Sequence, residues 1–373
     1  VGADGRSGAG CAAPGDRMNA LTLFSGAGGA DLGLRAAGFQ HLACIEADAH
    51  AGATLTAAGF PTVRAWIGDG PQPERLVRGK VQPSLPVWQH DGQSVDLLWA
   101  SPPCQPYSCA GQMLGTDDER DGWPATLAAI REVRPRWVVT ENVVGSPAEA
   151  WAGELRALYP EVQVWRANAV DWGLPSRRDR LYVIAGPMPW TPPAPTHYGP
   201  DAPWLLRGGR APWVGFGGVL GLDGTHPLLQ RPAPCVNTGE GNGHTCPDRE
   251  RDRGGAISRA ADALYLATGR RRLTVEECAI LVGFPEGYPF RGGVTASYRQ
   301  IGNAVAPVMA EMIGRSVAEA DMPPTRARAM WEPCECCPEF YCYLHHQHVY
   351  DCPCPSINEM AVDPYTQAAQ VIG

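Results

Sequence analysis

Residues 20–38 read ALTLFSGAGGADLGLRAAG and give the strongest indication of the fold. An apolar run at 20–24 leads into the turn Ser25-Gly26-Ala27-Gly28-Gly29, and a periodic segment follows until Gly38. This order is typical of a strand, a glycine-rich turn and a helix. Such a turn lets backbone N–H groups at the start of the helix face a ligand at close range. We therefore expect a ligand-binding α/β unit near the start of the chain.

The same alternation of short apolar runs and periodic segments continues along the chain. Strands are expected at 41–45, 95–99, 137–140 and 181–185. Helices are expected at 49–58, 123–133, 274–282 and 305–320. Strands that alternate with helices predict an α/β fold, with a Rossmann-like, mostly parallel sheet and helices on both faces.

The character of the chain changes twice after this α/β part. Between about 186 and 269 it is rich in Pro, Gly and Trp and only weakly periodic, which predicts a small loop-rich lobe. Pro323-Pro324 then precedes a Cys/His-rich C-terminal tail. The predicted divisions are a disordered lead-in at 1–17, an α/β domain at 18–186, the lobe at 187–269, a return to the α/β domain at 270–321 and the tail at 322–373.

Composition limits the class of protein. Hydrophobic residues make up 44% of the 373 residues, and no apolar run approaches the ~20 residues of a membrane span. The first residues lack the apolar segment of a signal peptide, so we expect a cytoplasmic protein without a membrane partner. A net charge of -8 counts against a nucleic-acid partner, although arginines cluster at 166–180 and 249–272.

Two carboxylates follow expected strands near the glycine turn. Glu46 lies 20 residues after Gly26, where a carboxylate is suited to accept hydrogen bonds from ribose hydroxyls. Asp69 follows a further short run and is a candidate to accept from an adenine amine, although a surface turn explains it equally well. The glycine turn lacks the full spacing of a dinucleotide fingerprint, and tight packing alone would also account for it.

A cysteine follows another expected strand in a rigid, polar loop. Cys104 comes directly after Pro102-Pro103, and the two prolines fix where its thiol points. Carboxyl ends of parallel strands share one edge of the sheet, so Glu141 should emerge beside it. Arg178 and Arg180 precede the strand at 181–185. A lone cysteine is more often a buried apolar residue, but a nucleophile, an acid and two cations around a crevice favour covalent catalysis.

Six motifs containing these residues together resemble the DNA cytosine-5 methyltransferase family, in that family's order and over about 21–317. They are FSGAGG at 24–29, SPPCQPYS at 101–108, ENV at 141–143, GLPSRRDR at 173–180, the segment from RLT at 272–274 to GFP at 283–285, and YRQIGNAV at 298–305. The sequence departs from the family at Ser176, where Gln is usual. It departs again at Ala47, where a large aromatic residue is frequent and supports cofactor affinity.

The resemblance implies methyl transfer from S-adenosylmethionine to carbon 5 of a cytosine flipped out of duplex DNA. Cys104 would add to carbon 6, and Glu141 would hold the ring N3 and the amino group. Arg180 and Arg178 would orient the base and stabilise the thiolate. Cofactor contacts are implied for Phe24, Ser25, Gly26, Gly28, Gly29, Glu46, Asp69, Pro103, Asn303 and Ala304.

The resemblance also implies partners and a setting. Double-stranded DNA would be the substrate, 187–269 the target-recognition lobe, and the protein a monomer with an associated restriction endonuclease in a prokaryotic or phage DNA-protection system. The alternatives are an RNA (tRNA) cytosine-5 methyltransferase and an inactive DNA-binding relative, and the intact Cys104, Glu141 and Arg180 count against the second. A nicotinamide oxidoreductase would share only the glycine turn.

The tail has the composition of a metal site. Six cysteines lie between 334 and 354 with three histidines among them, which suits tetrahedral zinc. The predicted ligands are Cys334, Cys336, Cys337, Cys342, His345, His348, Cys352 and Cys354. The spacing differs from a standard zinc finger, and a disordered tail with incidental cysteines is the alternative. Structural zinc is the second cofactor that the sequence predicts.

Overall fold

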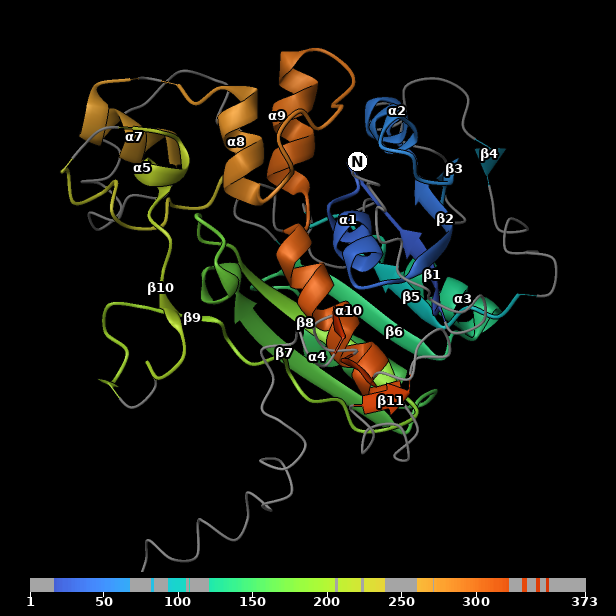
Figure 1. Ribbon diagram of the computed structural model, residues 1–373. Helices are drawn as coiled ribbons and strands as arrows, with labels where there is room; N and C mark the ends of the chain where they lie inside the picture. The colour runs from blue at the N-terminus through green and yellow to red at the C-terminus, as the bar shows by residue number, and fades with distance from the viewer. Residues whose placement is uncertain are drawn as a thin grey trace, which may run out of the picture. The chain divides into compact units, whose positions relative to one another are not determined.

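The computed structural model describes residues 17–67, 82–83, 93–104, 107, 121–204, 207–222, 225–238, 260–270 and 272–321, together with three short strands beyond residue 330. The chain divides into two units, one formed by 17–320 and the other by 1–16 with 321–373. The larger unit contains the main sheet and the helices that surround it (Figure 1).

An eight-stranded sheet forms the centre of the larger unit, in the order β4-β3-β2-β1-β5-β6-β8-β7 (Figure 1). All neighbouring strands run parallel except β8, which is antiparallel to both β6 and β7. The predicted Rossmann-like, mostly parallel sheet is therefore confirmed. The strands are β1 (Asn19–Leu23), β2 (Gln40–Glu46), β3 (Thr62–Trp66), β4 (Gln82–Pro83), β5 (Leu97–Ala100), β6 (Trp137–Val143), β7 (Glu161–Asn168) and β8 (Asp179–Gly186).

Helices cover both faces of the sheet because alternate strand residues point to opposite sides. Trp99 and Trp137 pack in one cluster with residues of α1 and α10, whereas Leu98 and Val138 pack in another with α3 and α4. None of the described helices has both the length and the apolarity needed to cross a bilayer. The longer helices are α1 (Gly29–Ala36), α2 (Ala49–Ala57), α3 (Trp123–Val133), α4 (Ala148–Leu155), α7 (Ala260–Thr268), α8 (Val275–Val282), α9 (Val294–Asn303) and α10 (Pro307–Asp321).

The strand order places a crevice between β1 and β5. The next three strands along the chain, β2, β3 and β4, lie in order on one side of β1, and β5 lies on the other side. Ligands of open α/β sheets bind at the carboxyl ends of the strands where the strand order reverses in this way. The glycine turn follows β1 and the Cys104 loop follows β5, so both flank the crevice.

Short elements make up the described part of the predicted lobe at 187–269. A 3₁₀ turn, η3 (Ala169–Trp172), precedes it, and β9 (His197–Tyr198) pairs with β10 (Ala211–Pro212). The short helix α5 (Phe216–Val219) packs with α7 and α8 through Phe216, Leu264 and Leu281. The loop-rich character is as expected, while the boundaries of the lobe stay a prediction.

Three elements differ from the sequence expectations in ways that matter for the site. β6 continues to Val143, so Glu141 lies within the strand and not after it. β8 is antiparallel and begins at Asp179, so Arg180 belongs to it. β7 was not expected, because most of its side chains are half-buried and it has no continuous apolar run.

The second unit contains a small antiparallel sheet of its own. Its strands are β11 (Trp331–Pro333), β12 (Phe340–Cys342) and β13 (Gln347–His348), in that order across the sheet.

Candidate active site

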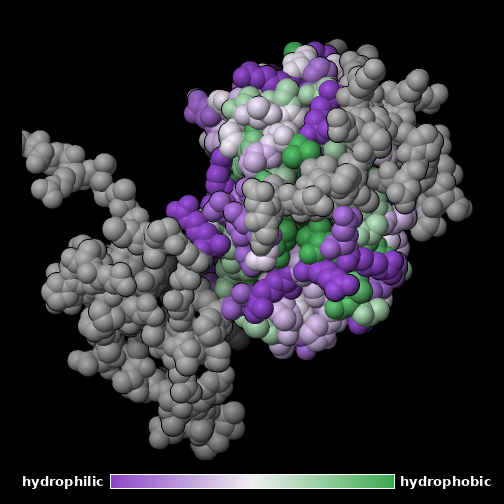
Figure 2. Space-filling view, turned by 90° about the vertical axis from the view of Figure 1, so that its right-hand side faces the viewer, coloured by the Kyte–Doolittle hydropathy of each residue, from purple (hydrophilic) through white to green (hydrophobic). Residues whose placement is uncertain are grey.

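A cavity opens at the carboxyl edge of the sheet, between the ends of β1 and β5. Residues that are far apart in the sequence line it, including apolar side chains such as Trp66 and Ile67 from the end of β3. Hydrophobic side chains also show in the middle of the face that Figure 2 turns to the viewer, with hydrophilic ones around them. Ten predicted site residues line the cavity: Phe24, Ser25, Gly26, Glu46, Pro103, Cys104, Glu141, Arg180, Asn303 and Ala304.

The turn after β1 is built from left-handed backbone. Phe24, Gly26 and Gly28 have φ angles of 55°, 58° and 88°. Glycine adopts such angles without steric cost, whereas a phenylalanine does so only where its surroundings enforce it. A Cβ on Gly29 would lie 2.1 Å from the carbonyl oxygen of Val305. Gly28 and Gly29 therefore serve the close packing of α1, and Phe24 and Gly26 face the cavity.

Glu46 ends β2 and holds this turn. Its carboxylate accepts hydrogen bonds from the backbone N–H groups of Gly26 (2.7 Å) and Asp48 (2.6 Å). Burial raises the pKa of Glu46, and the backbone N–H groups of Asp48, Gly26 and Ala47 oppose that rise. A carboxylate offers about four lone-pair sites, so acceptor capacity remains for two hydroxyl groups of a ligand.

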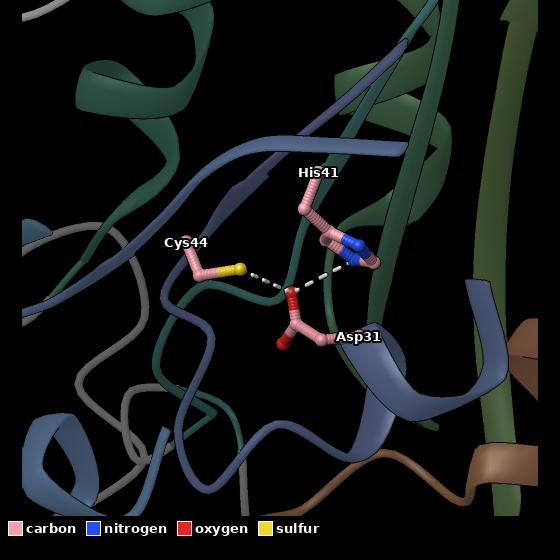
Figure 3. A group of neighbouring side chains, drawn as sticks. All are labelled: Asp31, His41 and Cys44. Carbon is pink, nitrogen blue, oxygen red and sulfur yellow. Dashed lines mark hydrogen bonds and ion pairs between the residues drawn. The ribbon is translucent and has the colours of Figure 1, made fainter. Parts of the chain in front are cut away.

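A buried polar cluster lies beneath the turn, and sequence reasoning missed it (Figure 3). Asp31 accepts hydrogen bonds from the Thr22 hydroxyl (2.6 Å) and the Cys44 thiol (3.1 Å), and His41 Nε2 lies 3.4 Å from it. Thr22 also lies 2.9 Å from the Ser25 hydroxyl of the turn. The Asp31, His41 and Cys44 ligand atoms lie within 4.8 Å of one another, and zinc accepts all three types. Because the thiol and the hydroxyl donate to one carboxylate oxygen, the cluster ties β1, α1 and β2 together beside the cavity.

Cys104 lies in the loop that follows β5 and is partly buried. The Asn142 side chain donates to the carbonyl oxygen of Pro102 (3.0 Å), which fixes the loop against β6. Burial raises the pKa of Cys104 and Glu141 raises it further, while Arg180 and Arg178 lower it. The free protein therefore holds Cys104 as a thiol at neutral pH, with two cations that favour the thiolate.

Glu141 and Arg180 form a largely buried ion pair in the cavity wall. Arg180 Nε lies 3.0 Å from Glu141 Oε1, and the two side chains are 13% and 9% exposed. Burial opposes the charge on Arg180, but its neighbours, Glu141 foremost, leave its pKa raised. The pair forms because β8 runs antiparallel to β6, so that its first residues lie at the edge where β5 and β6 end.

Arg178 is buried beside the cavity, with 3% of its surface exposed. Its guanidinium donates to the backbone carbonyls of Gly302 (3.0 Å), Ala304 and Val236 (3.5 Å). Ser176, which stands where the family usually has Gln, is also buried and donates to the carbonyl oxygen of Leu281 (2.7 Å). Both residues therefore join the arginine motif to later parts of the chain.

The end of α9 closes the cavity near the start of α2. Gln300 accepts from the Thr54 hydroxyl (2.7 Å), and Arg299 pairs with Asp48 at the start of α2 (2.8 Å). Arg299 and Gln300 line the cavity, although only Asn303 and Ala304 were expected there. The sequence could have indicated Arg299 and Gln300, because both stand in the motif at 298–305.

Cations and aromatic side chains occur together in the described part of the lobe. The Arg207 guanidinium carbon lies 5.4 Å from the Tyr198 ring centroid. The guanidinium carbon of Arg177, which precedes the lobe, lies 5.8 Å from the ring centroid of Trp213 in the lobe. Trp204 is 81% exposed. Such groups suit contacts with phosphates and bases.

Several predicted ligands lie outside the described residues. They are Asp69 and the tail residues Cys334, Cys336, Cys337, His345, Cys352 and Cys354. Cys342 and His348 belong by their backbone to β12 and β13. The zinc site and the adenine contact of Asp69 therefore stay predictions.

A doubly wound sheet with a glycine turn, a carboxylate after β2 and a cysteine beside an acid–arginine pair is typical of an α/β enzyme that uses a nucleoside-containing cofactor. The family model described as C-5 cytosine-specific DNA methylase matches residues 18–188 and 234–319. The chain belongs to this family, as the motifs predicted.

Curated relatives agree over most of the chain. Type II methyltransferase M.AplI of Arthrospira platensis is 31% identical over 320 residues, covering 80% of this chain and 84% of the relative. Type II methyltransferase M.NgoMIV of Neisseria gonorrhoeae is 30% identical over 322 residues, covering 82% and 98%.

Solved structures share the fold. Spodoptera frugiperda DNMT2 superposes with a TM-score of 0.53 at 16% sequence identity, covering 80% of this chain and 99% of that one. S. pombe Dnmt2 methyltransferase gives a TM-score of 0.52, also at 16% identity, covering 82% and 100%. At this identity the likeness concerns the fold alone.

Proposed function

We propose that the protein transfers a methyl group from S-adenosylmethionine to carbon 5 of a cytosine flipped out of duplex DNA. The observation that carries this proposal is the convergence of Cys104, Glu141 and Arg180 in the cavity that the glycine turn and Glu46 also line. Membership of the family supports the reaction. The family's description names DNA, which supports DNA over RNA as the substrate, and the relatives' name, Type II methyltransferase, supports a restriction–modification setting.

The cavity wall fits the cofactor. Glu46 retains acceptor capacity for the ribose hydroxyls after binding two backbone N–H groups. Phe24 is held in the wall for contact with the adenine ring, and Pro103 and Asn303 complete the lining. S-adenosylmethionine supplies an electrophilic methyl group when it is bound.

Cys104 acts on the base. Its sulfur forms a bond to carbon 6 of the cytosine, which makes carbon 5 nucleophilic toward the methyl group. After carbon 5 has gained the methyl group and lost its proton to water, the bond between sulfur and carbon 6 breaks. The thiol must first lose its own proton, because burial and Glu141 raise its pKa in the free protein. Arg180 and Arg178 promote that loss by stabilising the thiolate.

Glu141 binds the edge of the cytosine that carries N3 and the amino group. Arg180 fixes the carboxylate through the 3.0 Å ion pair and supplies positive charge beside the base. That edge of the cytosine is occupied by base pairing inside a duplex, so the base must leave the stack to reach Glu141.

The remaining partners follow from the same proposal. The lobe at 187–269 reads the DNA sequence, with Arg207 and the exposed Trp204 as described candidates for contact. The protein works as a monomer beside a restriction endonuclease, in a prokaryotic or phage-infected cytoplasm, and its tail binds structural zinc.

Bisulfite sequencing of DNA from bacterial cells that express the chain tests the proposed function. We expect cytosines at one recurrent sequence to resist conversion, and to lose that resistance when Cys104→Ser replaces the wild type at equal expression. Uniform conversion of DNA from cells that contain folded wild-type protein would count against DNA as the substrate.

A further inference from the structure

Arg178 is a buried cation whose side-chain partners are backbone atoms. Its Nη2 donates to the carbonyls of Gly302 (3.0 Å) and Ala304, and its Nη1 reaches the carbonyl of Val236 (3.5 Å). Its backbone N–H donates to the Asn168 side chain (3.0 Å). Burial lowers the pKa of Arg178 to about 10, and the neighbouring Arg180 adds to that effect. Removing a guanidinium group from water costs free energy. We therefore expect the contacts of Arg178 to hold the backbone of the site in a specific arrangement.

Two of the three carbonyls that Arg178 binds belong to the cofactor side of the cavity. Gly302 and Ala304 line it together with Asn303. The carbonyl oxygen of the next residue, Val305, would lie 2.1 Å from a Cβ added to Gly29. Val305 therefore packs directly against the glycine turn. A continuous path of backbone contacts thus leads from Arg178 through 302–305 to the glycine turn.

A second segment is packed into the same path. A Cβ on Gly302 would lie 2.4 Å from the backbone nitrogen of Thr238, so 237–238 rests directly on α9. Ala233 donates to the Pro175 carbonyl and accepts from the Arg177 N–H, both at 2.8 Å. The segment at 233–238 is therefore fixed to the arginine motif at one end and to the cofactor wall at the other.

We propose that Arg178 is a positioning residue that couples the cofactor side of the cavity to the cytosine side. Arg178 holds 302–304 in place for the cofactor, while Arg180, two residues later, holds Glu141 for the base. This inference rests on the proposed function. Lysine is a poor substitute, because one ammonium group lacks the planar fork that reaches carbonyls of two segments together.

Cofactor binding without DNA separates this role from a direct contact with cytosine. S-adenosylhomocysteine is titrated calorimetrically into full-length wild type, Arg178→Lys and Arg180→Lys, with Arg166→Lys in the exposed Arg166–Asp179 pair as a folding control. We expect a Kd roughly 10-fold higher for Arg178→Lys, as for the loss of one charge-assisted hydrogen bond, and no change for the other two. In steady state, Arg178→Lys should raise KM for S-adenosylmethionine, whereas Arg180→Lys should lower kcat at an unchanged KM.

Equal affinities of wild type and Arg178→Lys for S-adenosylhomocysteine would overturn the coupling. A folded wild type that does not bind this ligand would refute the proposed function itself, so the two failures are distinct. If Arg178→Lys does not fold, hydrogen exchange of the wild type tests the coupling instead. S-adenosylhomocysteine alone should then slow exchange in 233–238, which does not line the described cavity, and unchanged exchange there would overturn the inference.

Discussion

Replacing Glu46 with alanine should weaken cofactor binding far more than DNA binding. The carboxylate accepts the N–H groups of Gly26 (2.7 Å) and Asp48 (2.6 Å), and its remaining lone pairs are proposed to accept two ribose hydroxyls. A charge-assisted hydrogen bond contributes about 1.5–3 kcal/mol. Two such bonds at the lower limit give about 3 kcal/mol, which corresponds to roughly a 100-fold rise in Kd. The backbone N–H groups of Gly26 and Asp48 also lose their acceptor, so this figure is a lower bound.

Calorimetric titration with S-adenosylhomocysteine in the absence of DNA measures the effect directly. Glu46→Gln should give a smaller loss of affinity, because the amide keeps one carbonyl acceptor. Some loss should remain, because the amide N–H group faces a backbone donor. Glu149→Ala is a matched control, since that side chain is 77% exposed on α4 and lies 3.7 Å from Arg156. Its cofactor affinity should equal that of the wild type.

DNA binding by fluorescence anisotropy completes the comparison. Glu46→Ala should bind a duplex with the wild-type Kd, because the carboxylate faces only the cofactor side of the cavity in the proposal. A cofactor Kd within about twofold of the wild type would refute the ribose assignment. Equal losses of DNA and cofactor affinity would point instead to a general defect in folding.

Three further predictions concern protonation and metal binding. Alkylation of Cys104 by iodoacetamide, followed by mass spectrometry of its peptide, should be slow at neutral pH and accelerate as pH rises, because burial and Glu141 raise its pKa. Glu141→Gln should move this profile to lower pH, and an unmoved profile would remove Glu141 as a cause. Burial lowers the pKa of His41 below its ordinary 6.5, so the folded state binds fewer protons than the unfolded chain and loses stability as pH falls through that region. The thermal midpoint should therefore drop between about pH 7.5 and about pH 5 by more in the wild type than in His41→Gln, and equal drops would argue against this linkage. Elemental analysis of protein purified without chelators should find zinc, and truncation after Asp321 should remove it while some methyl transfer persists at high DNA concentration; metal-free full-length protein or an inactive but folded truncation would contradict one half of this prediction.

Much of the site could be predicted because the carboxyl ends of parallel strands all lie at one edge of the sheet. Glu46 and Cys104 follow or end strands that run in the same direction, so their convergence at one edge follows from strand order alone. Arg180 is different, since its place at that edge depends on β8 being antiparallel. The sequence analysis groups it with Cys104 and Glu141, and the resemblance of its motif supports that grouping, but strand order does not, because an apolar run has no direction.

The remaining features depend on contacts between distant parts of the chain. Arg178 and Arg180 stand two residues apart in one motif, yet the first binds carbonyls at 302–304 and the second binds Glu141. Nothing in the local pattern distinguishes them. Asp31 likewise looks like an ordinary helix residue, and it becomes a buried acceptor only when Thr22 and Cys44 are folded against it.

Mass spectrometry of the nucleosides released from treated nucleic acid directly tests whether the protein methylates carbon 5 of cytosine in DNA. Duplex DNA and, separately, tRNA are incubated with the purified chain and S-adenosylmethionine that carries a deuterated methyl group, beside Cys104→Ser as the control. We expect labelled 5-methyldeoxycytidine from the DNA with the wild type alone, and no comparable label in the tRNA. Label on adenine, on the cytosine amino group or chiefly in tRNA, or equal labelling by Cys104→Ser, would contradict this expectation.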